Sequence, residues 1–362
     1  MNSRLVAAVA LLILAFAPLS SSLSLKEVAA NPIMPEESVT PYTSADNSLD
    51  ENFTIVVVPD TQGYVTYYPW LFDNQTQWIV DNVEALNIVF VTHLGDLVDS
   101  YDNVTQWEYA NASMSKLGDN VRWAVLPGNH DGYYGDPDDL ANYEKYFGYE
   151  RFSGESWYAG TYKAEDNENS YQLFSAGGDD YLIFHIQYNP SDDVLFWASS
   201  VIDQHPDRRV IVSTHDYIKG PIDPDRRSGI GERMWHSFIK QHADQIFLVL
   251  CGHAGTQSTL VDTVNGHVVY QLLSDYQNAS NIESGWLRLL EFCPAQDKIY
   301  VKTYSPYLNE YKTDTTNEFT IDYDMTGAGV IPEFPSFPLL ILSMAATLLA
   351  ATIYRKHIKP KH

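Results

Sequence analysis

Five apolar runs of this chain each end in a short polar segment, and this recurring order constrains the fold more than any other feature. The segments are Asp60-Thr61-Gln62, Gly95-Asp96-Leu97-Val98-Asp99, Gly128-Asn129-His130-Asp131, His215-Asp216 and Gly252-His253. A short apolar run bounded by turn residues predicts a buried strand, so the polar segments are expected at strand carboxyl ends. Ligands bind at that edge of open α/β sheets. Carboxylate, amide and imidazole groups gathered there indicate a metal site.

The spacing of the apolar residues predicts an α/β fold. In the first half, helical runs at 74–86, 105–117 and 137–147 alternate with the strands, and this order predicts parallel strands. Beyond Trp157 the pattern predicts hairpins with turns at 177–180, 265–266 and 294–297, and helices at 193–204 and 230–242. Two mixed sheets packed face to face, with helices outside, would satisfy this order in one domain at 51–326.

The motifs resemble those of the calcineurin-like metallophosphoesterases, whose order is D-x-H, G-D-x-x-D, G-N-H-D/E, a lone His and G-H-x-H. The similarity runs from about residue 53 to 311, and the GDLVD and GNHD segments together carry its specificity. Gln62 stands where the family usually has His, as in a DTQ-type branch, and Gly255 stands where the last His would be. The resemblance implies a four-layer α/β/β/α sandwich. It also implies hydrolysis of a phosphomonoester or phosphodiester by attack of a metal-bound hydroxide.

Two divalent metal ions bridged by Asp96 are implied by the same resemblance. The ligands of the first ion would be Asp60, Gln62 and Asp96, and those of the second Asp96, Asn129, His215 and His253. The second set, with two imidazoles, suits Mn, Fe or Zn, whereas the oxygen-only first set suits Mn, Mg or Ca. Gly255 leaves a gap in the first set. Three outcomes are open there: water fills the gap, another residue such as Asp275 does, or the ion binds weakly.

His130 and Asp99 are the catalytic residues that the resemblance implies. His130 would stabilise the transferring phosphoryl group and protonate the leaving oxygen, and Asp99 would hold its imidazole as a positively charged acid. The alternative is a non-catalytic surface module for binding or adhesion that retains the fold and one structural metal. The presence of His130 and Asp99 favours the enzyme, because a structural metal needs neither.

Several other residues leave two interpretations open. Arg226 and Arg227 form the one basic pair that could meet a phosphate, or else part of a solvated loop. Cys251 and Cys293 either form a disulfide or are two separate buried thiols. His93 and His185 are expected in the core rather than among ligands. The tyrosines after the DTQ turn could line a substrate cleft or an exterior loop; they are Tyr64, Tyr67 and Tyr68.

Both ends of the chain have the composition of targeting segments. Residues 1–24 predict a signal peptide, with Arg4 before an apolar run, and 25–50 a flexible leader. Residues 327–335 predict a linker with a Pro-Glu-Phe motif, 336–354 an apolar span, and 355–362 a basic cytoplasmic tail. The motif, span and tail resemble archaeal PEF-type sorting signals, which implies a processing enzyme as partner; a simple membrane anchor is the alternative. Either places the domain on the extracellular face of the membrane.

The charge of the chain argues against a nucleic-acid partner. It holds 47 acidic against 22 basic residues, a formal net charge of −25, and so lacks the basic surface that a phosphate backbone requires. Five glycosylation sequons agree with exposure outside the cell. They begin at Asn52, Asn74, Asn103, Asn111 and Asn278.

Overall fold

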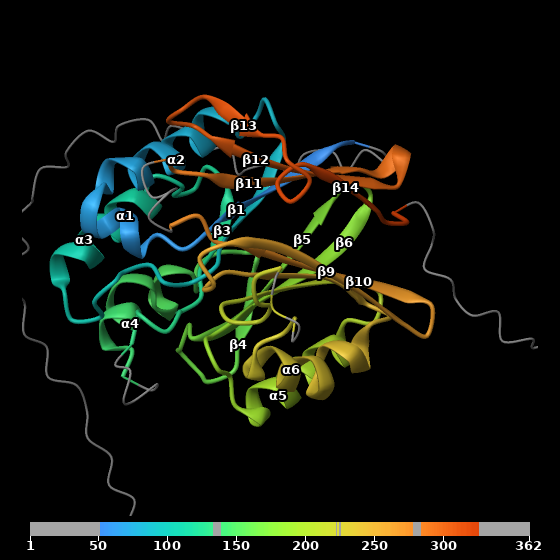
Figure 1. Cartoon of the computed structure of the whole chain (residues 1–362). Helices are drawn as coiled ribbons and strands as arrows, with labels where there is room; N and C mark the ends of the chain where they lie inside the picture. The colour runs from blue at the N-terminus through green and yellow to red at the C-terminus, as the bar shows by residue number, and fades with distance from the viewer. Residues whose placement is uncertain (1–50, 133–138, 222, 224–225, 278–283, 326–362) are drawn as a thin grey trace, which may run out of the picture. The chain divides into compact units, whose positions relative to one another are not determined.

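Two seven-stranded mixed sheets form the framework of the protein (Figure 1). The computed structural model describes residues 51–132, 139–221, 223, 226–277 and 284–325. The predicted signal peptide, leader, linker, apolar span and basic tail lie outside these residues, as does the sequon at Asn278. Within the described ranges, no helix has both the length and the apolar character needed to cross a membrane.

The first sheet carries the amino-terminal strands at its centre and edge. Its order is β13-β12-β11-β1-β2-β3, with β14 beside β12. The strands are β1 (Phe53–Val58), β2 (Ile88–His93), β3 (Arg122–Ala124), β11 (Leu287–Cys293), β12 (Lys298–Ser305), β13 (Glu310–Lys312) and β14 (Phe319–Asp322). β1, β2 and β3 are parallel, as the alternation of strands and helices predicted, whereas β11 is antiparallel to β1.

The second sheet has the order β4-β5-β6-β7-β8-β10-β9. Its strands are β4 (Tyr158–Thr161), β5 (Asn169–Ala176), β6 (Asp179–Ile186), β7 (Arg209–Thr214), β8 (Ile246–Cys251), β9 (Gln257–Val264) and β10 (His267–Ser274). β6, β7, β8 and β10 run parallel, so their carboxyl ends reach the same edge. The hairpin predicted at Asn265-Gly266 is confirmed, because both residues have positive φ, at 52° and 93°.

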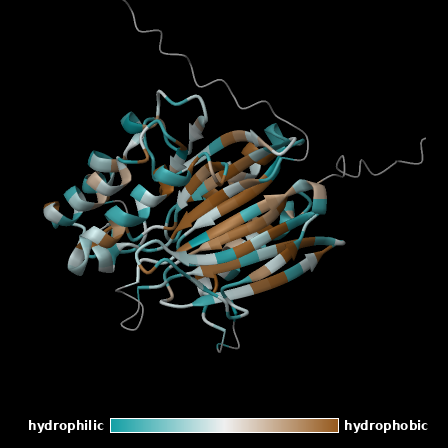
Figure 2. Ribbon diagram, turned by 90° about the horizontal axis from the view of Figure 1, so that it is seen from above, coloured by the Kyte–Doolittle hydropathy of each residue, from teal (hydrophilic) through white to brown (hydrophobic). Residues whose placement is uncertain are grey.

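Helices cover the outer faces of the two sheets. They are α1 (Gln62–Tyr67), α2 (Pro69–Asn82), α3 (Val104–Met114), α4 (Ala141–Phe147), α5 (Asp192–Gln204) and α6 (Gly229–Ser237), with short 3₁₀ turns η1 (Tyr149–Arg151), η2 (Ile239–His242) and η3 (Pro294–Gln296). α2 and α3 share an apolar cluster with the first sheet and the space between the sheets. α5 and α6 share another with the second sheet. The predicted α/β sandwich is therefore confirmed, and Figure 2 shows its apolar strands gathered in the interior.

The element boundaries differ from the predicted ones in two informative ways. Pro69 begins α2 at its first turn, five residues before the predicted start at 74, because proline fits the helix N-terminus. α1 starts inside the DTQ segment and was not predicted, since it is only one and a half turns long and has no apolar period to reveal it. The expected helix at 137–147 is observed from Ala141 onward, and its first residues fall partly outside the described ranges.

Candidate metal centre

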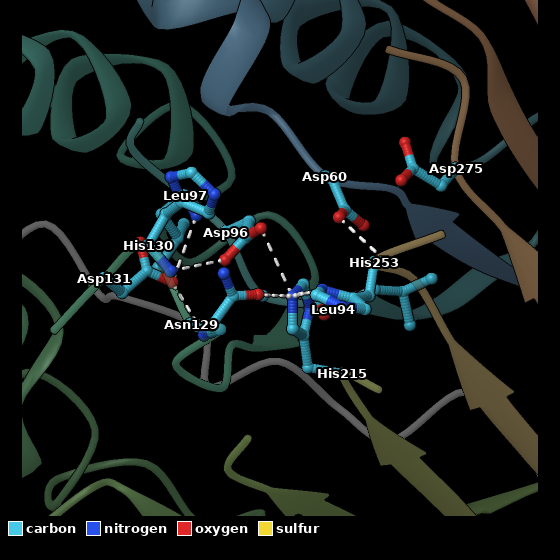
Figure 3. A network of polar contacts seen from close by, with 12 residues as sticks. Asp60, Leu94, Asp96, Leu97, Asn129, His130, Asp131, His215, His253 and Asp275 are labelled. Atoms are coloured by element: carbon cyan, nitrogen blue, oxygen red, sulfur yellow. Dashed lines mark hydrogen bonds and ion pairs between the residues drawn. The ribbon is translucent and has the colours of Figure 1, made fainter. Parts of the chain in front are cut away.

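The predicted polar segments meet where the parallel strands of the two sheets end (Figure 3). Asp60 follows β1 and Asp96 follows β2 in the first sheet, while His215 follows β7 and His253 follows β8 in the second. Loops rather than regular strands hold these side chains, so backbone hydrogen bonds between the loops must fix their positions. The centre thus lies between the sheets at their carboxyl edges, as predicted.

Three of the four ligands predicted for the second ion converge on Nε2 of the fourth, His215. Oδ1 of Asn129 lies 3.0 Å from this nitrogen, Oδ2 of Asp96 3.2 Å and Nδ1 of His253 3.2 Å. Among the described residues, Asp96, His215 and His253 form a group whose ligand atoms all lie within 4.8 Å of one another. Two imidazoles, one amide oxygen and one carboxylate are a donor set suited to Mn, Fe or Zn.

The position of the proton on His215 favours a cation at its Nε2 atom. Its Nδ1 lies 2.8 Å from the carbonyl oxygen of Leu94 and donates its proton there. Nε2 of the neutral ring therefore carries a lone pair, and this lone pair faces the acceptor oxygens of Asp96 and Asn129. Such facing lone pairs repel one another unless a proton or a metal ion lies between them. The residues present accordingly fit a divalent ion.

The charges of the neighbouring carboxylates also favour a positive charge at His215. Burial opposes a charge on His215, but the carboxylates of Asp96 and Asp60 outweigh it and raise the pKa of the imidazole to about 10. Burial likewise opposes ionisation of Asp96, yet His215 lowers its pKa overall. A metal ion at Nε2 would take the place of this proton.

The first predicted set, Asp60, Gln62 and Asp96, lies beside the second. The backbone amides of Thr61 and Gln62 donate to the carbonyl oxygen of Asp96 at 3.1 Å and 2.9 Å, which ties the DTQ loop to the GD loop. Oδ1 of Asp60 and Oε1 of Gln62 are both buried and have no hydrogen-bond partner. Unsatisfied buried acceptors are costly, and a cation would satisfy both. Burial raises the pKa of Asp60, and the neighbouring carboxylates of Asp275 and Asp96 raise it further.

Two motif glycines are explained by the close approach of carboxylates. A Cβ at Gly252 would stand 2.0 Å from Oδ1 of Asp60, and one at Gly128 would stand 2.2 Å from Oδ1 of Asp96. Any larger residue would displace an oxygen of a predicted metal ligand. Two of the predicted ligands themselves have left-handed backbones, Asp96 with φ 53° and His253 with φ 76°. Such strain persists at functional sites where the surroundings enforce it.

His130 lies beside this centre, but its partner differs from the predicted one. Nδ1 of His130 is 2.8 Å from the backbone carbonyl oxygen of Asp99 and 3.6 Å from Oδ1 of the same residue. The hydrogen bond therefore goes to the carbonyl group, and the carboxylate contributes charge from a longer distance. The backbone amide of His130 donates to Oδ1 of Asp96 at 2.9 Å, so the histidine is held beside the carboxylate predicted to bridge the two ions.

Asp131 is a site residue to which the sequence prediction gave no role. Its carboxylate accepts hydrogen bonds from the backbone amides of Gly128, Leu97 and Val98 at 2.8 Å, 3.1 Å and 3.0 Å. It thereby joins the GDLVD loop to the GNHD loop. Burial, aided by Asp96, raises the pKa of Asp131 to about 7. Its position in the GNHD motif was the sequence feature that could have marked Asp131 as a site residue.

Tyr188 was not predicted either. Its ring centroid lies 6.0 Å from that of His215 and 5.9 Å from that of His253, and it thus forms a wall beside the two imidazoles. It follows β6 in a loop, and no sequence motif marked it.

His93 and His185 are fully buried, as expected of core residues. Nδ1 of His93 accepts from the amide of Gly95 at 3.1 Å, and its Nε2 lies 3.1 Å from Oγ1 of Thr61. The imidazole therefore fixes two loops that carry ligands. Burial lowers the pKa of His93 to about 3, which keeps the ring neutral.

The arginine pair faces the protein rather than a substrate. Arg227 is buried and donates to Oε1 of Gln271 and to Asp262, while Arg226 donates to Ser258 and Thr259. The interpretation of this pair as a solvated loop was therefore wrong for Arg227, because its guanidinium also packs 4.1 Å from the ring centroid of Trp235.

The two cysteines are separate buried thiols, one of the two alternatives for them. Among the tyrosines after the DTQ segment, Tyr64 is buried and Tyr67 is exposed.

The geometry agrees with comparisons to known proteins. The family model described as calcineurin-like phosphoesterase matches residues 53–257. An uncharacterized protein of Bacillus subtilis strain 168, YvnB, is 37% identical over 287 residues, which cover 75% of this chain. The match spans only 22% of that relative's length.

Among solved structures, the purple acid phosphatase PPD1 of yellow lupin is similar with a TM-score of 0.50 and 13% identity, over 76% of this chain and 54% of that one. GAP50, the anchor in the inner membrane complex of Plasmodium, is similar with a TM-score of 0.43 and 11% identity, over 76% and 92% of the two chains. These likenesses concern the fold. The family match covers more than half of the chain and contains every predicted ligand, and the chain belongs to the calcineurin-like phosphoesterase family.

Proposed function

We propose that this chain is a metal-dependent phosphoesterase that hydrolyses a phosphomonoester or a phosphodiester. One observation carries the proposal: side-chain atoms of Asp96, Asn129 and His253 converge on Nε2 of His215, and His130 is bonded through its amide to the carboxylate of Asp96. Divalent ions bound there would act as Lewis acids on a phosphoryl oxygen and on the attacking water. A structural metal alone would not require the adjacent imidazole of His130.

The role of His130 follows from its hydrogen bonds. Because Nδ1 donates to the carbonyl oxygen of Asp99, Nε2 is the ring atom left to exchange a proton with a substrate. Its side chain is 38% exposed, so a substrate can reach it. A protonated His130 would stabilise negative charge on the phosphoryl group and give its proton to the leaving oxygen.

Hydrolysis of aryl phosphomonoesters and phosphodiesters by the full chain, with and without Mn²⁺, tests the proposal. Activity should require the metal, disappear with a chelator, and fall strongly in His130→Ala. His236→Ala is a matched control, because this histidine of α6 is 64% exposed and its ion-pair partner is Glu232 of the same helix. Absence of hydrolysis across both panels by a chain with bound metal would contradict the proposal and favour the binding-module alternative.

We further propose that the domain is displayed on the outer face of the cell and attached through the carboxyl-terminal segment. The support is the sequence: an apolar stretch at 336–354 followed by Arg355, Lys356, Lys359 and Lys361. The Pro-Glu-Phe motif before it would be the recognition element for a processing enzyme. Protease added to intact cells should remove the domain, and complete protection would contradict this orientation.

A further inference from the structure

We propose that the first ion of this centre is held by oxygen atoms alone, and that Asp275 supplies the ligand that the missing histidine at Gly255 would provide. The inference rests on the proposed two-metal site and extends it, because it assigns a ligand and a class of cation. Four oxygen-bearing side chains would then hold the first ion: Asp60, Gln62, Asp96 and Asp275.

The topology places Asp275 beside the predicted ligand His253. β8 and β10 are parallel neighbours, and Leu273 pairs with Cys251. Asp275 and His253 therefore occupy equivalent positions beyond the paired ends of the two strands. Figure 3 shows the carboxylate of Asp275 on the side that faces Asp60.

Hydrogen bonds anchor this carboxylate at the position of the missing histidine. Oδ2 of Asp275 accepts from the backbone amide of Gly255 at 2.6 Å, and Oδ1 accepts from the amide of Gln277 at 3.2 Å. The residue is 0% exposed. A carboxylate offers about four lone-pair positions. These two bonds therefore leave lone pairs free for a metal ion.

Gln277 connects the same segment to the first set of ligands. Its Nε2 lies 3.5 Å from Oδ2 of Asp60, and its Oε1 accepts from the amide of Gly63 at 3.1 Å. The segment containing Asp275 is thus fastened to the DTQ loop on one side and to Gly255 on the other. This explains how Asp275 is held close to Asp60 although the two residues come from different sheets.

Unsatisfied acceptors point to a cation here independently of Asp275. Oδ1 of Asp60, which is 1% exposed, and Oε1 of Gln62 are buried without a hydrogen-bond partner. Within the described part of the chain, neither Asp60 nor Asp275 forms an ion pair with lysine or arginine. Buried carboxylates that no lysine or arginine pairs with are unfavourable, and His215 is the cationic side chain that opposes both of these charges. A divalent cation supplies the charge and occupies the unsatisfied oxygens.

The chemistry of the donors sets the cation class. Carboxylate and amide oxygens without imidazole or thiolate favour Mg²⁺, Mn²⁺ or Ca²⁺, whereas the neighbouring pair of histidines favours Zn²⁺ or iron. The two positions should therefore select different metals.

The full chain can be stripped of metal, given one equivalent of Zn²⁺ to fill the histidine position, and titrated with Mn²⁺ while the binding is followed by electron paramagnetic resonance.

Wild-type protein should bind one further Mn²⁺ ion, Ca²⁺ should displace it, and its pulsed spectrum should lack nitrogen coupling. Asp275→Asn should weaken Mn²⁺ binding by about 100-fold, the upper end of the loss for supporting residues of metal sites, and retain the Zn²⁺. Asp244→Asn, in the exposed turn before β8, is the matched control. Mn²⁺ affinity unchanged in Asp275→Asn would overturn the proposal.

The spectrum of the wild-type chain tests the oxygen-only site even if the Asp275→Asn variant does not fold. Nitrogen coupling to the added Mn²⁺, or no binding of Mn²⁺ beside the Zn²⁺, would show that oxygen donors including Asp275 do not hold the first ion. None of these measurements uses a substrate. A chain that binds Mn²⁺ as expected but hydrolyses nothing would contradict the proposed function and leave this inference standing.

Discussion

The backbone amide of His253 donates a hydrogen bond to Oδ2 of Asp60 at 2.9 Å, across 193 residues of sequence. This bond joins the first ligand motif to the last and the first sheet to the second. It leaves Oδ1 of Asp60 without a protein partner. One carboxylate oxygen therefore orients the loop after β8, while the other is available to a metal ion. The two motifs that we propose to bind separate ions are in this way joined as one unit.

Gly252→Ala should disrupt this unit. The new methyl group would stand 2.0 Å from Oδ1 of Asp60, so either the carboxylate or the loop after β8 must move. We expect a loss of about 1–3 kcal/mol in the free energy of unfolding, the usual cost of overpacking, together with reduced metal content. Thermal melts and elemental analysis measure the two effects. Gly154→Ala is the control, because no atom lies within 4 Å of its added Cβ; equal behaviour of the two variants would contradict the prediction.

The metal ligands should differ in importance. Asp96→Ala should lose the most metal, because its carboxylate lies between the two ligand sets. His253→Ala should lose more than Gln62→Ala, since an imidazole binds borderline metals more strongly than an amide oxygen does. Metal content after gel filtration gives the ranking. If Gln62→Ala lost as much metal as Asp96→Ala, the prediction would be contradicted. Binding of the first ion, and not the carboxylate of Asp96, would then determine how much metal the protein holds.

Glu168 should make stability depend on pH. Burial, aided by Asp166, raises its pKa from 4.5 to about 7, so the folded state binds more protons than the unfolded state between these values. Stability is therefore lost as pH rises from about 4.5 to 7. Glu168→Gln should melt at a higher temperature than the wild type at pH 8 and at about the same temperature at pH 4. Glu310→Gln, on an exposed strand, is the control. A variant less stable than the wild type at pH 8 would contradict this assignment.

The ligand loops could be predicted from sequence because each follows an apolar strand. Asp96, His215 and His253 all appear where a run of buried residues ends, and parallel strands bring such ends together. The same logic located Asp275 after β10. It could not decide whether Asp275 approaches Asp60, because that depends on Gln277 and on the packing of one sheet against the other.

The roles of residues that accept hydrogen bonds from backbone amides could not be predicted from the sequence. Asp131 stabilises two loops by accepting three amide bonds, and His93 does so from within a strand. The GNHD motif marked Asp131 without showing its partners, and His93 had no motif, because the amides and the Thr61 hydroxyl that they contact are brought to them only by the fold. The hydrogen-bond partner of His130 could not be predicted either. It is the backbone carbonyl oxygen of Asp99, and the carboxylate of the same residue lies farther away.

His130→Ala should separate catalysis from metal binding. His130 contributes only its backbone amide to Asp96, and alanine retains that group, so metal content should stay near the wild-type value. Turnover should fall by about 10²–10⁴-fold, the scale of a general acid. The loss should be smaller for an activated aryl phosphate, whose leaving group needs no proton, than for an alkyl phosphate. Rates for a series of leaving groups, measured with bound metal quantified in the same samples, provide the test. A uniform loss across the series would mean that the imidazole acts on the phosphoryl oxygens instead. An emptied metal site would mean that His130 is itself a ligand.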